Sequence, residues 1–143
     1  MAPFVITRDT ALTPQQAWAR VVDWRRHGAY VPLTTVSVGR AAGATVVTAR
    51  TGIGALGFDD PMEIVEWAPP SDGATGRCRL EKRGRVLRGW AEISVAPRDG
   101  GARVTWREEA MPAHLPRFAI GMAGATGALV FGRVLRRLLD EPG

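Results

Sequence analysis

The chain has few of the residues that cross-link small proteins or bind metals. One residue is a cysteine, Cys78, which excludes an internal disulfide and a thiolate metal cluster. The only histidines are His27 and His114, and neither has metal-ligand spacing to another histidine, cysteine or carboxylate. The glycines at 52–57 match a nucleotide-binding loop only in part and lie between antiparallel strands, not ahead of a helix. We therefore expect no metal and no cofactor.

A long apolar run and a signal peptide are also missing. The longest apolar run, 118–132, has 15 residues and is rich in small side chains, whereas a membrane-spanning helix needs about 20. The first six residues contain no basic stretch followed by an apolar one, so they do not resemble a secretion signal. We therefore expect no membrane span and a location in the cytoplasm of a bacterium.

Lysine is almost absent, although the chain is basic. The net charge is +5, and Lys82 is the only lysine among 19 basic residues. A basic balance raises the question of nucleic acid or an anionic membrane as partner. The arginines are scattered and no run of five like charges occurs. An arginine bias with abundant alanine and glycine is also what a GC-rich genome produces, so nucleic-acid binding is disfavoured.

The remaining composition is typical of a globular domain. Hydrophobic residues make up 45% and charged residues 23% of the chain, close to the averages for folded proteins, which excludes disorder. At 143 residues one domain is the expectation, and folding would bury roughly 70% of the unfolded surface. We expect a single domain over residues 1–143.

The first third of the chain predicts one strand and two short helices. Residues 4–10 alternate in the manner of a strand. Thr13 is expected to cap a helix, with Pro14 at its first position and Gln16 completing a capping box. A second short helix or turn is expected between Asp23 and Gly28, before a proline at position 32 ends the helical region.

A period of two begins at residue 33 and predicts a sheet. Strands are expected at 33–39, 44–51, 60–68, 76–84, 86–96 and 102–110, separated by turn signals. Consecutive strands joined by short turns pair antiparallel. After Pro112 and Pro116 the helical period returns, and Phe118, Met122, Leu129 and Arg133 lie along one side of a long helix. The sequence therefore predicts an α+β fold in which this helix covers one face of a seven-stranded antiparallel sheet.

A family resemblance rests on residues spread along the whole chain. They are Thr13-Pro14 with Trp18, Asp23-Trp24, Phe58 to Trp67 with Pro69-Pro70, Gly89-Trp90-Ala91, Pro97 with Gly100-Gly101, and Val104-Thr105-Trp106. In this order they resemble the START-like (Bet v 1-like) SRPBCC superfamily, and within it the bacterial polyketide cyclase/dehydrase and lipid-transport proteins. The resemblance implies a helix-grip fold, in which the sheet wraps around the long helix and leaves a cavity between them.

Strand phase and the resemblance together predict the residues that line the cavity. They are Tyr30, Val47, Ala49, Leu80, Leu87, Ala91, Trp106, Glu108, Phe118, Met122 and Thr126. Glu108 shares its face with Trp106, so it either orients a ligand or acts as a general acid or base with a raised pKa. The alternative is a bulge that turns Glu108 outward. Lys82 is in phase with Leu80 and has the same two interpretations.

Tyr30 and Arg50 are the other catalytic candidates. The resemblance implies that Tyr30 borders the cavity, where its hydroxyl could donate to a ligand carbonyl, although a packing role is the alternative. Arg50 could polarise a polyketide oxygen, as an arginine does in cyclases of the family. However, Ala49 is the simpler inward residue, which would leave Arg50 in solvent. Trp90 faces outward and is the candidate for a partner contact or a homodimer surface.

Three functions remain open at this point. The first is the binding of a hydrophobic small molecule, of lipid, polyketide or isoprenoid type, in an internal cavity. The second is a polyketide cyclase, aromatase or dehydratase acting on such a ligand, with one donor and one base in the cavity. The third is a protein or nucleic-acid interaction module that uses the arginine-rich outer face. They differ in whether Glu108, Tyr30 and an arginine share one cavity, and whether the arginines form a continuous patch.

Overall fold

The fold is an antiparallel sheet with helices on one face. The computed structural model describes residues 3–31, 33–52, 57–112, 129 and 132–140. The elements are β1 (Phe4–Thr10), α1 (Pro14–Val21), α2 (Trp24–Ala29), β2 (Thr34–Ala41), β3 (Ala44–Thr51), β4 (Phe58–Ala68), β5 (Gly76–Lys82), β6 (Leu87–Arg98) and β7 (Gly101–Pro112). Residues 132–140 form a further helix. The predicted helix-grip fold class is confirmed.

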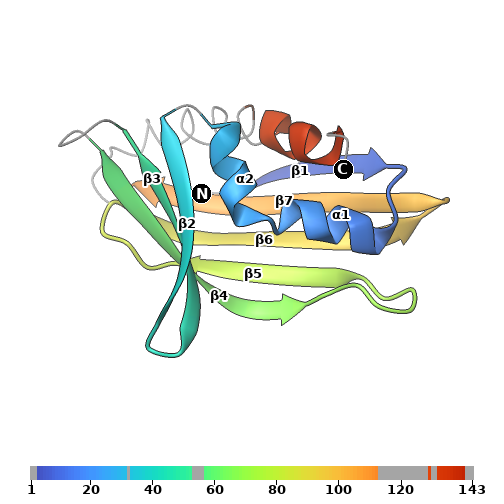
Figure 1. Ribbon diagram of the computed structural model, residues 1–143, viewed down its shortest axis with the longest axis horizontal. Helices are drawn as coiled ribbons and strands as arrows, with labels where there is room; N and C mark the ends of the chain where they lie inside the picture. The colour runs from blue at the N-terminus through green and yellow to red at the C-terminus, as the bar shows by residue number, and fades with distance from the viewer. Residues whose placement is uncertain (1–2, 32, 53–56, 113–128, 130–131, 141–143) are drawn as a thin grey trace.

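The seven strands form one sheet in the order β1-β7-β6-β5-β4-β3-β2. All neighbouring strands pair antiparallel. The sheet is strongly bent, so that β2 and β3 run across the direction of β5 to β7 (Figure 1). Helices α1 and α2 and residues 132–140 lie on the same side of it (Figure 1).

Helix α1 begins as its sequence predicts. The backbone nitrogen of Gln16 donates to Oγ1 of Thr13 over 3.1 Å, and the backbone nitrogen of Thr13 donates to Oε1 of Gln16 over 3.0 Å. This capping box satisfies two backbone donors that a helix end would leave unpaired. The buried face of α1 carries Ala17, Trp18 and Val21, and the helix lies against β6 and β7.

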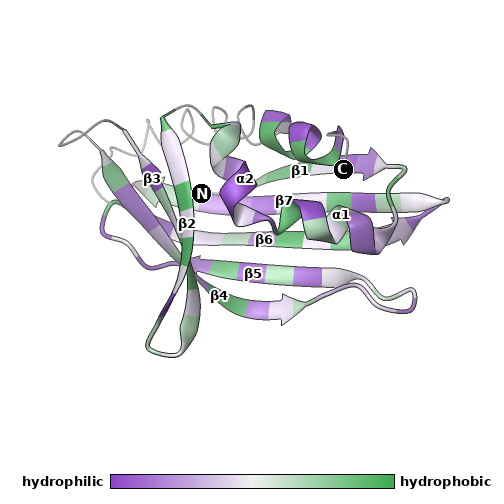
Figure 2. Cartoon of the chain, in the orientation of Figure 1, coloured by the Kyte–Doolittle hydropathy of each residue, from purple (hydrophilic) through white to green (hydrophobic). Residues whose placement is uncertain are grey.

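Alternation along the strands produces the core. Hydrophobic and hydrophilic residues follow one another along the sheet (Figure 2). Beneath α1 the inward residues Cys78, Ile93, Val95 and Val104 are fully buried. Burying such side chains contributes roughly 1.5–3 kcal/mol each. This end of the sheet is therefore a close-packed core, on which the first helix is held.

A bulge divides β4 into two halves of opposite phase. The pairing of β4 with β5 shifts between Ile64 and Glu66, and the extra residue, Val65, is exposed. Beyond the shift, Trp67 lies opposite Cys78 and faces the helices. Its ring meets that of Trp18 edge to face, with the centroids 5.1 Å apart. The bulge thus turns the side chain of Trp67 toward α1, and such a change of side-chain direction is a common effect of bulges.

The helix at 132–140 packs on the same core. Its apolar side is buried through Val134, Leu135, Leu138 and Leu139, and Nη1 of Arg20 in α1 donates to the backbone oxygen of Leu138 over 3.4 Å. The predicted earlier turns of this helix, at 118–128, lie outside the described residues. Among the helices that the structure describes, none is long and apolar enough to cross a membrane.

Candidate functional site

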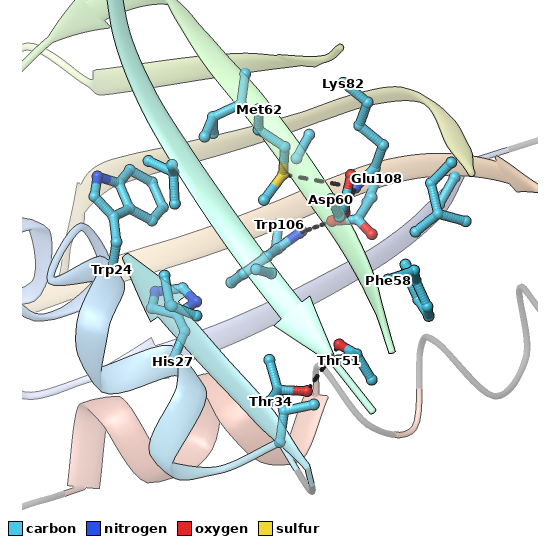
Figure 3. Close-up of a pocket in the computed structure, with 18 of the residues that line it drawn as sticks. Trp24, His27, Thr34, Thr51, Phe58, Asp60, Met62, Lys82, Trp106 and Glu108 are labelled. Atoms are coloured by element: carbon cyan, nitrogen blue, oxygen red, sulfur yellow. Dashed lines mark hydrogen bonds and ion pairs between the residues drawn. The ribbon is translucent and has the colours of Figure 1, made fainter. Parts of the chain in front are cut away.

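A cavity of about 270 Å³ opens at the end of the sheet away from α1. Helix α2 and all seven strands contribute to its lining, which is mostly apolar (Figure 3). The described lining residues are Phe4, Trp24, His27, Val31, Thr34, Val36, Val47, Ala49, Thr51, Phe58, Asp60, Met62, Leu80, Lys82, Leu87, Ala91, Trp106, Glu108 and Ala110. This volume is slightly below the usual range of ligand pockets, which is roughly 300–1,000 Å³.

Three ionisable side chains meet in this apolar lining. Asp60 comes from β4, Lys82 from β5 and Glu108 from β7, and each residue is less than 9% exposed. Nζ of Lys82 donates to Oδ2 of Asp60 over 2.6 Å. The other oxygen of Asp60, Oδ1, is buried and has no hydrogen-bond partner among the residues that the structure describes. A buried carboxylate oxygen without a partner is uncommon, so this atom marks the site.

The geometry favours a protonated Glu108. Burial raises the pKa of this carboxyl above its ordinary value, and the nearby carboxylate of Asp60 adds to the rise. The cation of Lys82 and a hydrogen bond from Trp106 lower the pKa and only partly oppose it. With Lys82 and Asp60 neutralising each other, an ionised Glu108 would leave one net negative charge in an apolar cavity, which is costly.

His27 is a cavity residue that the sequence did not reveal. Its Nε2 lies 2.7 Å from the backbone oxygen of Val21 and must therefore donate to it. Burial lowers the pKa of His27, with the hydrogen bond and Asp23 opposing, so the ring is neutral and Nδ1 is an acceptor. The ring packs between Trp24 and Trp106, with centroids 5.4 and 5.2 Å away. Trp24 and His27 are three residues apart and therefore share one face of the helix. This spacing is the sequence pattern that could have placed His27 beside Trp24 at the cavity.

Most of the predicted lining residues lie where the strand phase put them. Glu108 and Lys82 both face the cavity, so the alternative of a bulge or a solvent-exposed strand end is wrong for each. Phe118, Met122 and Thr126 lie outside the described residues, as does His114. The remaining residues of the lining prediction that the structure places at the cavity are Val47, Ala49, Leu80, Leu87, Ala91 and Trp106.

Tyr30 and Arg50 do not lie at the cavity. Tyr30 is the half-buried C-terminal cap of α2, and its neighbour Val31 lines the cavity instead. Arg50 lies on the outer face of β3 because Ala49 takes the inward position. Its side chain is 51% exposed, and Nη1 lies 2.9 Å from Oδ1 of Asp59. The structure therefore separates both candidates from Glu108.

The outer face of the sheet mixes charges of both signs. Arg79 approaches Glu81 and Glu92, and its guanidinium lies over the ring of Trp90, 4.5 Å from the centroid. Other outer arginines pair with acids in the same way: Arg50 with Asp59, Arg83 with Glu63, and Arg98 and Arg103 with Asp9. This arrangement gives the nucleic-acid interpretation no support. Within the described residues, no cluster of histidine, cysteine and acidic side chains is suited to a metal ion.

Comparison with known proteins identifies one family. The family model described as polyketide cyclase / dehydrase and lipid transport matches residues 1–141. No curated protein matches the sequence significantly.

Solved structures share the fold at low sequence identity. A protein from Thermus thermophilus has a TM-score of 0.68 at 15% identity, over 96% of this chain and 93% of that one. A STAR-related lipid transfer protein from Xanthomonas axonopodis has 0.66 at 13%, over 92% and 82%. The Zhui aromatase/cyclase from Streptomyces sp. R1128 has 0.63 at 14%, over 95% and 92%. At these identities the likeness shows the fold alone.

Proposed function

Because the chain belongs to the polyketide cyclase/dehydrase and lipid-transport family, we propose that it binds one hydrophobic small molecule in the cavity between sheet and helices. Lipids, polyketides and isoprenoids are the candidate classes. The proposal treats residues 1–143 as one ligand-binding domain that acts in the bacterial cytoplasm. A homodimer also stays a prediction, and Trp90 remains the residue proposed for its surface.

The observation that carries this proposal is an apolar cavity with polar groups concentrated in one cluster. Apolar side chains from every strand form the walls. Transfer of an apolar molecule from water to these walls would therefore lower its free energy. The side chains of Asp60 on β4, Lys82 on β5 and Glu108 on β7 come together in the cavity (Figure 3). A few polar groups in an apolar pocket are what orients a bound ligand.

Native mass spectrometry tests the proposal. The protein, purified from its own host, should carry a stoichiometric hydrophobic passenger that denaturing extraction releases and identifies. Ala91→Phe, which fills the cavity from the centre of β6, should lose the passenger, whereas Ala96→Phe on the outer face of the same strand should keep it. A mass without passenger, together with no binding from a panel of lipids and aromatic polyketides, would refute the binding function.

A second candidate function, proton-transfer catalysis on the bound molecule, is supported by Glu108. Burial raises the pKa of the Glu108 carboxyl, so it keeps a proton to donate at a higher pH than an exposed glutamate does, and Asp60 is an acceptor in the same cavity. This pair would suit cyclisation or dehydration of a polyketide-like substrate. Once the passenger is known, Glu108→Gln distinguishes the functions, because it should retain binding and abolish any turnover.

A further inference from the structure

The cluster of Asp60 and Glu108 offers a ligand two unused hydrogen-bonding atoms of opposite kind. The first is Oδ1 of Asp60, which has no partner in the described part of the chain. Lys82 occupies only the other oxygen of that carboxylate. The Asp60 side chain is 10% exposed and belongs to the cavity lining. Oδ1 is therefore an acceptor in the cavity wall that is shielded from water and has no partner among the described residues.

The second unused atom is Oε2 of Glu108. Nε1 of Trp106 donates to Oε1 of Glu108 over 3.3 Å, so Oε1 serves as the acceptor and the proton of the neutral carboxyl resides on Oε2. Oε2 makes no hydrogen bond within the described residues. Burial of the carboxyl in an apolar cavity, beside the carboxylate of Asp60, favours the protonated form and raises the pKa of Glu108. Glu108 therefore presents a donor beside the acceptor of Asp60.

We propose that the cavity selects a compact apolar molecule that carries a neutral hydroxyl, as an alcohol, a phenol or an enol, held between Asp60 and Glu108. This inference rests on the proposed binding function. One hydroxyl can donate a hydrogen bond to Oδ1 of Asp60 and accept a hydrogen bond from the protonated Oε2 of Glu108. A single group of the ligand then satisfies both oxygens. An ether or ketone satisfies only Glu108, and a hydrocarbon satisfies neither.

Anionic head groups do not match this cluster. A carboxylate or phosphate brings only acceptors toward Oδ1 of Asp60 and adds a negative charge where Lys82 already has its counter-ion. The cavity volume of about 270 Å³ also favours a compact molecule over a two-chain lipid. The selected class is therefore small, uncharged and hydroxylated.

Three probes with the same naphthalene body test the head-group preference. Isothermal titration calorimetry compares 2-naphthol with 2-methoxynaphthalene, which cannot donate, and with 2-naphthoate, which is anionic. We expect naphthol to bind about tenfold more tightly than the methoxy compound, the equivalent of one well-placed hydrogen bond. Naphthoate should bind more weakly than either.

Variants connect the preference to the cluster. Asp60→Leu combined with Lys82→Met removes the acceptor without leaving a buried charge, and it should abolish the tenfold preference while methoxynaphthalene still binds. Asp59→Asn is the matched control, because that neighbouring side chain is 54% exposed on the outer face, and it should keep the preference. Glu108→Gln retains a donor and should bind naphthol within about threefold of the wild type.

The outcomes separate this inference from the binding function. Equal affinity for naphthol and its methyl ether, or preference for naphthoate, overturns the hydroxyl inference and leaves the binding function standing. No binding of any probe, by protein whose native mass shows no passenger, overturns both. A preference that survives in the Asp60→Leu/Lys82→Met variant also refutes the assignment, because the acceptor would then lie elsewhere.

Discussion

Breaking the buried ion pair should cost far more stability than breaking an exposed one on the same strand. Asp60→Asn leaves the cation of Lys82, whose side chain is 2% exposed, without its partner at 2.6 Å. At that distance and an effective dielectric of about 20, the attraction is about 6 kcal/mol, and desolvation offsets part of it. Removing one partner of a buried pair costs about 3–5 kcal/mol. This is a large share of a total stability of roughly 5–15 kcal/mol.

Urea denaturation of a double-mutant cycle measures this effect. Asp60→Asn and Lys82→Met should each lower the free energy of unfolding by about 3–5 kcal/mol, whereas the double variant should approach the wild type, since no charge is left buried. Asp59→Asn breaks the pair with Arg50, whose side chains are 51% and 54% exposed, and should cost less than about 1 kcal/mol. The reasoning is refuted if Asp60→Asn costs no more than Asp59→Asn, or if the two losses simply add.

Three further predictions concern Glu108, Gly89 and Cys78. Burial raises the pKa of Glu108, so the unfolded chain releases this proton at a lower pH than the folded protein does. The contribution of Glu108 to stability should therefore fall as pH rises above about 4.5, by at most about 1.4 kcal/mol per pH unit until the folded pKa is passed. In urea denaturation, this loss of stability with rising pH should be absent from Glu108→Gln and present in Glu109→Gln, the outward neighbour. Gly89 has a φ of 130°, and a Cβ added there would collide with the backbone oxygen of Glu109. Thermal unfolding of Gly89→Ala should therefore show a loss of stability of at least about 2 kcal/mol, whereas Gly39→Ala, whose Cβ meets open space, should change stability by less than about 1 kcal/mol. Equal effects of the two substitutions would contradict the steric argument. Burial raises the pKa of Cys78 to about 12 and leaves the thiol without exposed surface, so a thiol reagent should label it only in denaturant, and rapid labelling of native protein would show that this core opens.

The fold was predictable because its signals are local. Alternation and turn residues predicted β1 and β3 with the observed bounds, and the capping box at Thr13 marked the start of α1. The bounds of the other strands differ by one to two residues at their ends, where alternation is weakest. The bulge after Ile64 was not foreseen, because a shift in pairing depends on the partner strand and not on the local pattern.

Two of the three residues in the polar cluster, Lys82 and Glu108, were predictable from the sequence, and the third, Asp60, was not. Strand phase placed Glu108 and Lys82 on the inward face, yet a charged residue there is normally read as an exposed strand end. What makes the burial tolerable is Asp60, 22 residues before Lys82 and on the neighbouring strand. Pairing of charges across strands depends on register, which a single sequence does not reveal. For His27 the sequence offered only its spacing to Trp24, because the atom that it bonds is a backbone oxygen, which has no sequence signature.

The bulge in β4 suggests how this protein could change its ligand over evolution. Before Val65, alternate residues of β4 such as Met62 face the cavity, whereas Trp67 beyond it anchors the first helix through Trp18. The two halves of one strand therefore have separate tasks, recognition on one side and structural integrity on the other. Mutations among the apolar wall residues, such as Met62, can reshape specificity while the Trp67–Trp18 contact is left untouched. We expect divergent relatives to vary most before this point, and an engineer could start there.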